Sequence, residues 1–216
     1  MGGTERAHPL RLAVLLSGGG RSLRNLLDRI AAGTLPAEVV VVVSSRPDVN
    51  GIDIARSAGV PTFVIPRKDH ADHVSFSAAV NEVLEPLHPE LIVLAGFLSL
   101  YFPPPELEQC VMNIHPALLP SFGGKGFYGH RVHETVLGSG VKVSGCTVHF
   151  ADPEYDAGPI IVQRAVPVLD DDDADTLAAR VFEQECEAYP EAIHLFAEGR
   201  LRIEGHRVRI LPPCGP

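Results

Sequence analysis

The sequence has 216 residues, about the size of one large α/β domain, and 45% of them are hydrophobic, which favours a globular protein over a disordered one. The formal net charge of −9 argues against nucleic acid as a main partner, although a local nest of backbone N–H groups can bind a small anion on an acidic protein. No run of 18 apolar residues occurs, and residues 1–9 lack the apolar core of a signal peptide, so we expect a cytoplasmic protein with no membrane contact.

Apolar runs and helical patterns alternate in the first half of the chain. Buried strands are expected at 10–16, 39–43, 62–65, 91–95 and 110–114. Helices are expected between Ser22 and Gly33, at 52–58 and at 74–87. This α/β alternation implies right-handed crossovers and a doubly wound, mostly parallel sheet of the Rossmann-like kind.

The second half of the chain has a different pattern. The expected elements are a helix at 131–137, two antiparallel strands at 141–150 and 159–168, a helix from Asp173 to about Glu198, and a hairpin at 200–210. Asp173 is a suitable N-cap, and Pro190 is expected to kink the long helix. Because no repeat or linker is visible, we predict a single domain over 1–216, with an α/β half at about 10–110, a second half at about 111–204, and tails at both ends.

The expected strand that ends at Pro116 carries two polar side chains on one face. Asn113 and His115 are two residues apart, so they project from the same side of the strand end. An amide N–H can stabilise a developing oxyanion, and an imidazole can carry a proton near neutral pH. The pair therefore suits acyl or formyl transfer to an amine, although a buried strand whose polar residues are paired with backbone groups is an equal alternative.

A glycine-rich turn lies between the first strand and the first helix, where backbone N–H groups at a helix N-terminus can bind phosphate. A dinucleotide fingerprint fails, because Leu23 occupies its third glycine position and no acidic residue closes the second strand. We expect a phosphate monoester held by Gly20, Arg21 and Ser22. A tight turn without a ligand is the alternative.

Two carboxylates of the second half are candidates for the same chemistry. Asp156, in the loop 151–159, could raise the pKa of His115 and orient its ring, unless the loop is only a solvated turn. Glu185 interrupts the expected buried face of the last helix between Val181 and Tyr189. A buried carboxylate needs a partner, which is either an internal salt bridge or a substrate group.

Cysteines and histidines do not indicate a metal centre. The four cysteines are scattered without a C-x-x-C pair, which is typical of free thiols in a reducing compartment. His130 and His133 are three residues apart, but no H-E-x-x-H motif is present. We therefore expect neither a metal nor a disulfide.

Four motifs occur in a characteristic order: Ser17-Gly18-Gly19-Gly20-Arg21-Ser22, Leu94-Ala95-Gly96-Phe97, Asn113-Ile114-His115-Pro116-Ala117-Leu118-Leu119-Pro120, and Thr147-Val148-His149-Phe150 followed by Asp156-Ala157-Gly158-Pro159. With them the chain resembles the phosphoribosylglycinamide formyltransferases, from about Leu12 to Leu201. The resemblance implies the formyltransferase fold and metal-free transfer of the formyl group of 10-formyltetrahydrofolate to the amine of 5'-phosphoribosylglycinamide (GAR), giving formyl-GAR in de novo purine biosynthesis.

The resemblance also implies a role for each candidate residue. Asn113 would hold the formyl oxygen, His115 would move the proton, and Asp156 would raise the pKa of His115 and order a water. The GAR phosphate would contact the glycine turn, and Glu185 would bind the ribose or glycinamide end. The folate would contact His73, Leu98, Ser99, Leu100, Tyr101, Asn113 and Asp152.

Some positions depart from the family pattern. Leu98-Ser99 stands where Met-Arg is usual, and His73 replaces an arginine commonly found before the helix that holds Phe76. Phe182 stands where a polar or basic residue near the phosphate is frequent, and we hypothesise that Arg21 compensates. The glycine-rich loop 121–130 is expected to be mobile and to act as a lid.

Three other functions compete with this interpretation. A formyltetrahydrofolate hydrolase would use the same three polar residues with water as the acceptor, but such enzymes typically carry an additional N-terminal domain. A methionyl-tRNA formyltransferase should be longer and carry a basic region, against which the charge of −9 argues. A non-catalytic nucleotide-binding module leaves Asn113 and His115 without a purpose. A monomer and a homodimer are both compatible with the sequence.

Overall fold

The computed structural model describes residues 8–213, which form two compact units, the first ending at Met112 and the second beginning at Asn113. The expected N-terminal tail lies almost entirely outside the described residues, as does the end of the expected C-terminal tail. A single domain over the whole chain stays a prediction. Within residues 8–213, no helix combines the length and the apolar character needed to cross a bilayer.

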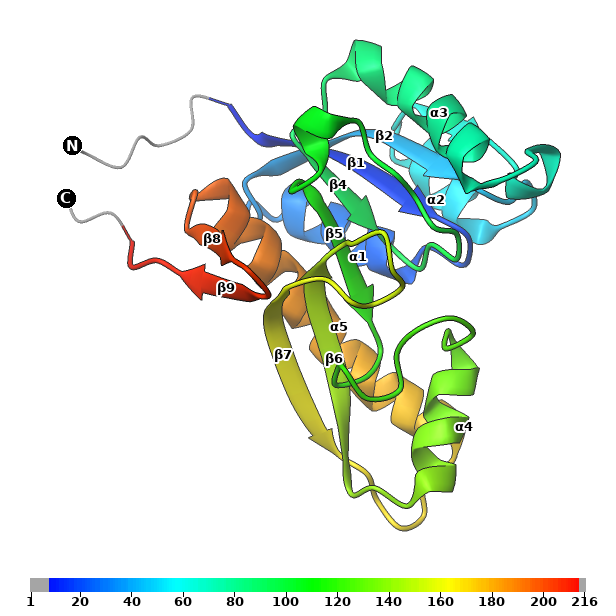
Figure 1. Cartoon of the computed structure of the whole chain (residues 1–216), viewed down its shortest axis with the longest axis vertical. Coiled ribbons are helices and arrows are strands. Elements are labelled where there is room, and N and C mark those ends of the chain that lie inside the picture. Colours follow the sequence, from blue (N-terminus) through cyan, green and yellow to red (C-terminus); the bar gives the residue numbers. More distant parts are fainter. Residues whose placement is uncertain (1–7, 214–216) are drawn as a thin grey trace. The chain divides into compact units, whose positions relative to one another are not determined.

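The first unit alternates strands and helices (Figure 1). Its elements are β1 (Leu10–Leu16), α1 (Arg21–Ala31), β2 (Ala37–Ser44), α2 (Asn50–Ser57), β3 (Thr62–Val64), α3 (His73–Leu84), β4 (Leu91–Leu94) and the start of β5 (Val111–His115), with 3-10 turns at Arg67–Asp69, Glu85–Leu87 and Pro105–Leu107. The strands follow the order β3-β2-β1-β4-β5. β1 pairs in parallel with β2 and β4, and β2 with β3, which confirms the expected mostly parallel α/β sheet.

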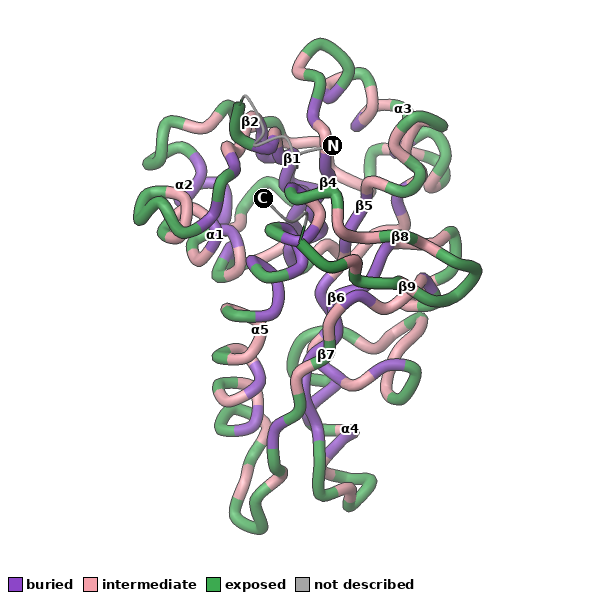
Figure 2. Tube along the Cα trace, turned by 90° about the vertical axis from the view of Figure 1, so that its left-hand side faces the viewer, coloured by how far each residue is buried: buried purple, intermediate pink, exposed green. Residues whose placement is uncertain are grey.

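Strands β1 and β4 form the core of the first unit. Every residue of β4 is buried, and in β1 only Arg11 is partly accessible (Figure 2). A parallel strand that is covered on both faces has no solvent side, which explains why both strands are apolar apart from Arg11. The polar ends of such strands are where the chain can expose functional groups.

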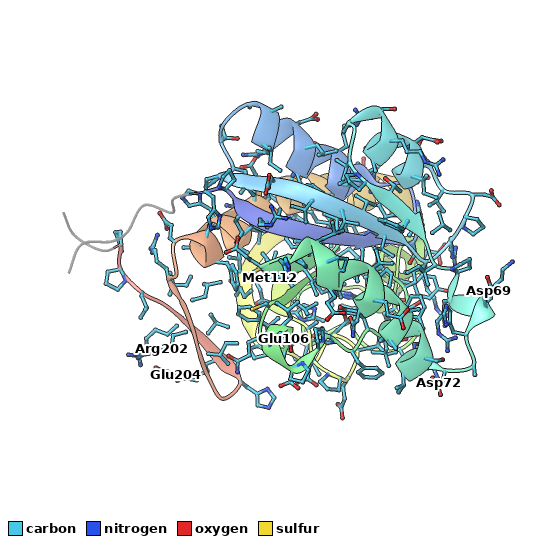
Figure 3. All side chains as sticks on the ribbon, turned by 90° about the horizontal axis from the view of Figure 1, so that it is seen from above. Asp69, Asp72, Glu106, Met112, Arg202 and Glu204 are labelled. Carbon is cyan, nitrogen blue, oxygen red and sulfur yellow. The ribbon has the colours of Figure 1, made fainter. Side chains whose placement is uncertain are left out.

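Helix α3 differs from the expected helix at 74–87. It begins with a capping box, in which the carboxylate of Asp72 accepts a hydrogen bond from the Ser75 N–H at 2.7 Å (Asp72 is labelled in Figure 3). The α-helix ends at Leu84, and Glu85–Leu87 continue as a 3-10 turn. Pro86 explains the difference, since proline has no N–H for a helical hydrogen bond and restricts the residue before it.

The second unit contains the end of β5 and the rest of the chain. Its further elements are α4 (His130–Ser139), β6 (Val143–Phe150), β7 (Ile160–Pro167), α5 (Ala174–Ala197), β8 (Leu201–Glu204) and β9 (Arg207–Ile210). The strands follow the order β5-β6-β7-β9-β8. β6 and β7 are antiparallel, and β8 and β9 form an antiparallel hairpin, so the expected antiparallel C-terminal addition is confirmed.

Helix α5 packs on β6 and β7 within the second unit (Figure 1). Asp173 caps it as expected, because its carboxylate accepts the Thr176 N–H at 2.8 Å while the Thr176 hydroxyl accepts the Asp173 N–H at 2.9 Å. Pro190 lies inside the helix and is buried, and a kink there stays a prediction. Glu185, which was expected on the buried face of this helix, is half-buried.

Candidate active site

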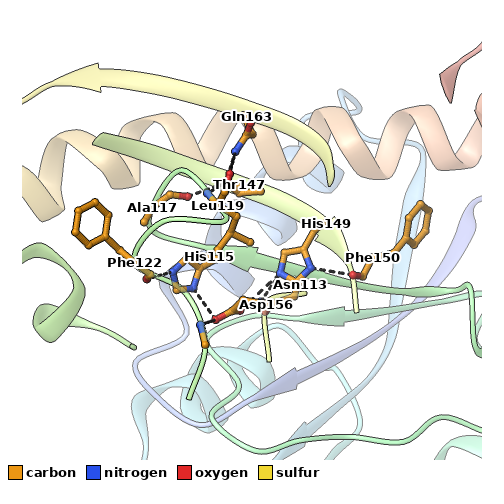
Figure 4. Close-up of polar contacts among 11 residues, drawn as sticks. Asn113, His115, Ala117, Leu119, Phe122, Thr147, His149, Phe150, Asp156 and Gln163 are labelled. Carbon is orange, nitrogen blue, oxygen red and sulfur yellow. Dashed lines mark hydrogen bonds and ion pairs between the residues drawn. The ribbon is translucent and has the colours of Figure 1, made fainter. Parts of the chain in front are cut away.

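The end of β5 places Asn113 and His115 on one side of the strand, as their spacing predicts (Figure 4). His115 is buried and Asn113 is half-buried. Both side chains point toward Asp156, which lies in the loop after β6 (Figure 4). The expected meeting of these three groups is therefore confirmed, although they are far apart in the sequence.

Asp156 contacts four groups at the centre of this site. Its Oδ2 atom lies 3.5 Å from His115 Nδ1 and accepts the Gly124 N–H at 2.9 Å. Its Oδ1 atom lies 3.3 Å from the amide nitrogen of Asn113 and 3.7 Å from His149 Nε2. Since only 10% of the Asp156 side chain is exposed, the alternative of a solvated turn is excluded.

The hydrogen bond to Phe122 decides which ring nitrogen of His115 carries the proton. His115 Nε2 lies 2.8 Å from the carbonyl oxygen of Phe122. A carbonyl oxygen can only accept, so Nε2 must donate. In the neutral ring, Nδ1 is then a lone-pair acceptor that faces the carboxylate of Asp156 at 3.5 Å.

The pKa of His115 lies below its ordinary value of 6.5. Burial lowers it most, because it removes water from the charged ring, and the nearby His149 lowers it slightly further. The charge of Asp156 and the hydrogen bond to Phe122 raise it, but by less. The expected upward influence of Asp156 is therefore present, yet burial outweighs it and leaves His115 neutral and ready to accept a proton at neutral pH.

The carboxyl of Asp156 stays ionised despite its burial. Burial raises the pKa of Asp156, but its interactions with His149, His115 and the Gly124 N–H together lower it by more, so the net direction is downward. The site thus combines a neutral imidazole with an ionised carboxylate. Proton uptake by His115 would convert this pair into a buried ion pair.

His149 is a further member of the site to which the sequence assigned no role. It is buried at the end of β6, and its Nδ1 donates to the Phe150 carbonyl oxygen at 2.8 Å. Its Nε2 is then an acceptor in the neutral ring and lies 3.1 Å from the amide nitrogen of Asn113. The sequence signal was a histidine inside a buried strand, but strand periodicity alone could not show what it contacts.

The chain that leaves β5 is held in place by residues of β6 and β7. The Thr147 hydroxyl donates to the Ala117 carbonyl at 2.7 Å and accepts the Leu119 N–H at 3.0 Å. The amide nitrogen of Gln163 contacts both the Leu119 carbonyl and the Thr147 hydroxyl at 3.0 Å. These bonds, drawn in Figure 4, fix the path of the segment that reaches His115 at Phe122.

In the first unit, the glycine turn is tied to the start of α2. The Gly51 N–H donates to the Gly18 carbonyl, and the Asn50 side chain donates to the Gly19 carbonyl, both at 3.2 Å. Gly20 has a φ of 73°, and a Cβ atom there would lie 2.6 Å from the Cα of Gly51. These contacts involve the carbonyl groups of the turn. Helix α1 begins at Arg21, and no side chain caps the N–H groups of its first turn. This arrangement suits an anion, and phosphate binding stays a prediction.

The residues expected to contact folate lie in both units. In the first unit, the Leu98 N–H donates to the Ser17 hydroxyl at 3.0 Å, and the buried Tyr101 donates to the Asn81 side chain at 2.6 Å. Desolvation raises the pKa of Tyr101, and its hydroxyl proton is donated to Asn81. In the second unit, Asp152 accepts the Glu154 N–H at 3.1 Å. Their role in folate binding stays a prediction.

His73, at the start of α3, has a cationic neighbour that the sequence did not indicate. Arg67 Nε donates to His73 Nδ1 at 3.4 Å, and another Arg67 nitrogen donates to the His70 carbonyl at 2.7 Å. The Arg67 guanidinium also lies 6.0 Å from the centre of the Phe76 ring. A positive charge is therefore present beside His73, although His73 itself replaces an arginine.

Glu185 lies in the second unit on α5, close to Cys146 of β6. Burial and then the charge of Glu185 raise the pKa of Cys146 to about 12. Partial burial of a carboxylate costs less free energy than full burial, so the position of Glu185 does not by itself require a ligand. A salt bridge and a substrate contact both stay predictions for Glu185. Among the described residues, no group of three or more His, Cys, Asp or Glu side chains could hold a metal ion.

Comparison with known proteins identifies the family of this chain. The model of a family described as formyl transferase matches residues 10–193. The chain belongs to the formyl transferase family. Its resemblance to phosphoribosylglycinamide formyltransferases is also confirmed, since the formyl transferase of that name from Haemophilus influenzae is 35% identical over 196 residues, which cover 90% of each chain.

Two other similar proteins show how the chain relates to longer and to equally long relatives. The trifunctional purine biosynthetic protein adenosine-3 of Gallus gallus is 43% identical over 203 residues, which are 93% of this chain but 20% of that protein. The chain thus spans a fifth of this relative. The crystal structure of glycinamide ribonucleotide transformylase 1 from Symbiobacterium toebii has a TM-score of 0.89 and 42% identity, and the match covers 98% of this chain and 100% of that one.

Proposed function

We propose that this protein transfers the formyl group of 10-formyltetrahydrofolate to the amine of GAR, giving formyl-GAR in de novo purine biosynthesis. The observation that carries the proposal is the contact of one ionised carboxylate, Asp156, with both an imidazole and an amide. Amine attack on a formyl carbon produces an oxyanion and requires a proton to move between two nitrogens, so it needs these groups. The names of the similar proteins support GAR as the acceptor of the formyl group.

Asn113 is proposed to stabilise the oxyanion. Its amide nitrogen lies 3.1 Å from His149 Nε2 and 3.3 Å from Asp156 Oδ1. The bond to His149 fixes the plane of the amide. The formyl oxygen would replace Asp156 Oδ1 as the acceptor of the second hydrogen, and this bond would strengthen as the oxygen gains charge.

His115 and Asp156 are proposed to move the proton. The neutral ring accepts the proton that the attacking amine loses, and the resulting imidazolium is stabilised by the carboxylate 3.5 Å away. The same proton then passes to the nitrogen of the departing tetrahydrofolate. Burial of both side chains strengthens the attraction between them, because little water screens it.

The remaining candidate residues are proposed to bind the substrates. Gly20, Arg21 and Ser22 would bind the GAR phosphate, and Glu185 its ribose or glycinamide end. His73, with Arg67 beside it, the segment Leu98–Tyr101 and Asp152 would contact 10-formyltetrahydrofolate, which is a co-substrate. That the reaction uses no metal, that the protein is cytoplasmic, and that it is a monomer or homodimer stay predictions.

The decisive experiment is incubation of the protein with 10-formyltetrahydrofolate in the presence and absence of GAR. We expect tetrahydrofolate and formyl-GAR to form in equal amounts, and only when GAR is present. Tetrahydrofolate production that does not depend on GAR would indicate a hydrolase. No turnover under either condition, by a folded protein that binds one of the substrates, would indicate a binding module.

Replacement of Arg21 by alanine tests the phosphate site. The change removes an exposed cation at the uncapped start of α1, so we expect KM for GAR to rise about tenfold, the equivalent of 1.4 kcal/mol. KM for 10-formyltetrahydrofolate should change little. Arg56→Ala, an equal charge change in the last turn of α2, is the control and should leave both constants near the wild-type values. Equal increases in both constants for Arg21→Ala would contradict the assignment.

Replacement of Asp156 by asparagine tests the ion pair through its pH dependence. His115 must be neutral to accept a proton, so wild-type kcat/KM should fall as pH decreases through the pKa of His115, which lies below 6.5. Removing the carboxylate removes an influence that raises this pKa, so the acid limb should move to lower pH while the plateau rate decreases. Asp171→Asn, at an exposed loop position, should leave the profile unchanged. An acid limb that moves to higher pH would contradict this role.

A further inference from the structure

The segment Phe122–Gly124 binds both side chains of the proposed proton-transfer pair. The Phe122 carbonyl oxygen accepts the His115 Nε2–H at 2.8 Å, and the Gly124 N–H donates to Asp156 Oδ2 at 2.9 Å (Figure 4). Phe122 has a φ of 56°, a left-handed conformation that is unfavourable for a non-glycine residue. Phe122 is therefore held in an unfavourable backbone conformation, in a segment whose backbone groups bond to the proposed proton-transfer pair.

Gly123 lies where a side chain has no room. A Cβ atom there would overlap with Leu119 Cδ2 and would lie 3.3 Å from Asp156 Cβ. Leu119 is buried, and both its N–H and its carbonyl are bonded, to Thr147 and Gln163. Because these bonds fix the backbone of Leu119, a side chain at Gly123 would have to displace either the Leu119 side chain or the segment itself.

Two acceptors compete for the single proton of the neutral His115 ring. Alone, the Asp156 carboxylate would draw that proton to Nδ1, because a hydrogen bond to a charged acceptor is the stronger one. The Phe122 carbonyl draws it to Nε2 instead and is closer, at 2.8 Å compared with 3.5 Å. The Gly124 N–H occupies the same Oδ2 atom that faces Nδ1, which weakens the pull of the carboxylate. Both bonds of the segment thus favour the same tautomer.

We propose that the backbone of Phe122–Gly124 is a positioning element that holds His115 in the Nε2–H tautomer, so that Nδ1 is the atom that accepts the proton of the substrate amine. The proposal rests on the proposed function. The amine nitrogen bonds to the formyl carbon, and the carbonyl electron pair moves to oxygen. The amine proton moves to Nδ1. The oxyanion then re-forms the C=O bond, the bond from carbon to the folate nitrogen breaks, and that nitrogen takes the proton from Nδ1. In the other tautomer, Nδ1 would already carry a proton and could not accept one.

The tautomer can be measured directly by NMR on the whole protein labelled with 15N-histidine. The spectrum is recorded above the pKa of His115, and His115→Gln identifies the His115 signals. We expect a protonated Nε2 and an unprotonated Nδ1 in the wild type. In Gly123→Ala, the proton should shift partly or wholly to Nδ1, and kcat should fall on the order of 10²-fold with the two KM values within a few-fold of wild type.

Gly138→Ala is the matched control, since no atom lies within 4 Å of a Cβ atom at that position in α4. It should keep the wild-type tautomer and kcat. A wild-type ring protonated at Nδ1 would overturn the proposal, even if Gly123→Ala fails to fold. Unchanged tautomer and kcat in a folded Gly123→Ala protein would also overturn it. Absence of formyl transfer by the wild type would instead contradict the proposed function, because the tautomer is measured without substrates.

Discussion

Replacement of His115 by alanine is expected to lower kcat by roughly 10²–10⁴-fold, the range that a positioned proton carrier contributes. His115 Nδ1 lies 3.5 Å from Asp156, whereas His149, the other imidazole at the site, has its Nδ1 bonded to the Phe150 carbonyl and its Nε2 3.1 Å from the amide nitrogen of Asn113. The measurement is steady-state formyl transfer at saturating GAR and 10-formyltetrahydrofolate. The reaction should become nearly independent of pH across the range in which His115 titrates.

His115→Gln separates loss of proton transfer from loss of structure. The glutamine amide can still donate to the Phe122 carbonyl, which accepts from His115 at 2.8 Å in the wild type. It cannot take up a proton, so we expect it to be as inactive as the alanine variant while unfolding at nearly the wild-type temperature. Near-normal turnover by either folded variant would show that the proton carrier is elsewhere.

Replacement of Asn113 by alanine is expected to lower kcat by roughly 10²–10³-fold, the usual effect of losing one oxyanion donor. The amide lies within reach of both His149 and Asp156, so its hydrogens are oriented before the substrate binds. Because the bond to the formyl oxygen strengthens only as charge develops, KM for 10-formyltetrahydrofolate should stay within a few-fold of wild type.

Asn113→Asp provides the sharper comparison for the same position. Aspartate has nearly the same shape but replaces the amide donor with a second carboxylate beside Asp156, which would repel an oxyanion. We expect it to be no more active than Asn113→Ala. A large rise in KM with unchanged kcat in both variants would mean that Asn113 only binds the substrate and does not stabilise the transition state.

Local sequence patterns predicted most of the secondary structure and part of the site. The two-residue spacing of Asn113 and His115 was sufficient to place both on one side of β5, because side chains alternate along any strand. Asp173 was recognisable as an N-cap because capping involves only the first turn of a helix. The helix at 74–87 was predicted too long, since Pro86 acts on the backbone of its neighbours.

Contacts between distant segments could not be predicted in the same way. Asp156 and His115 come from separate elements of the chain, and the sequence predicted their contact only as one of two interpretations of the loop 151–159. The role of His149, the Arg67 neighbour of His73 and the bond from His115 to Phe122 were not indicated at all. Each depends on how the chain folds back on itself.

The sequence by itself determined the α/β order of the elements and the side of β5 from which the amide and imidazole project, since both depend on neighbouring residues. Only the tertiary structure decided the chemical state of that imidazole. Burial lowers the pKa of His115 by more than Asp156 raises it, and the Phe122 carbonyl determines its tautomer. Desolvation and hydrogen bonding depend on all the groups that surround a side chain, and the fold brings those groups together from separate parts of the chain.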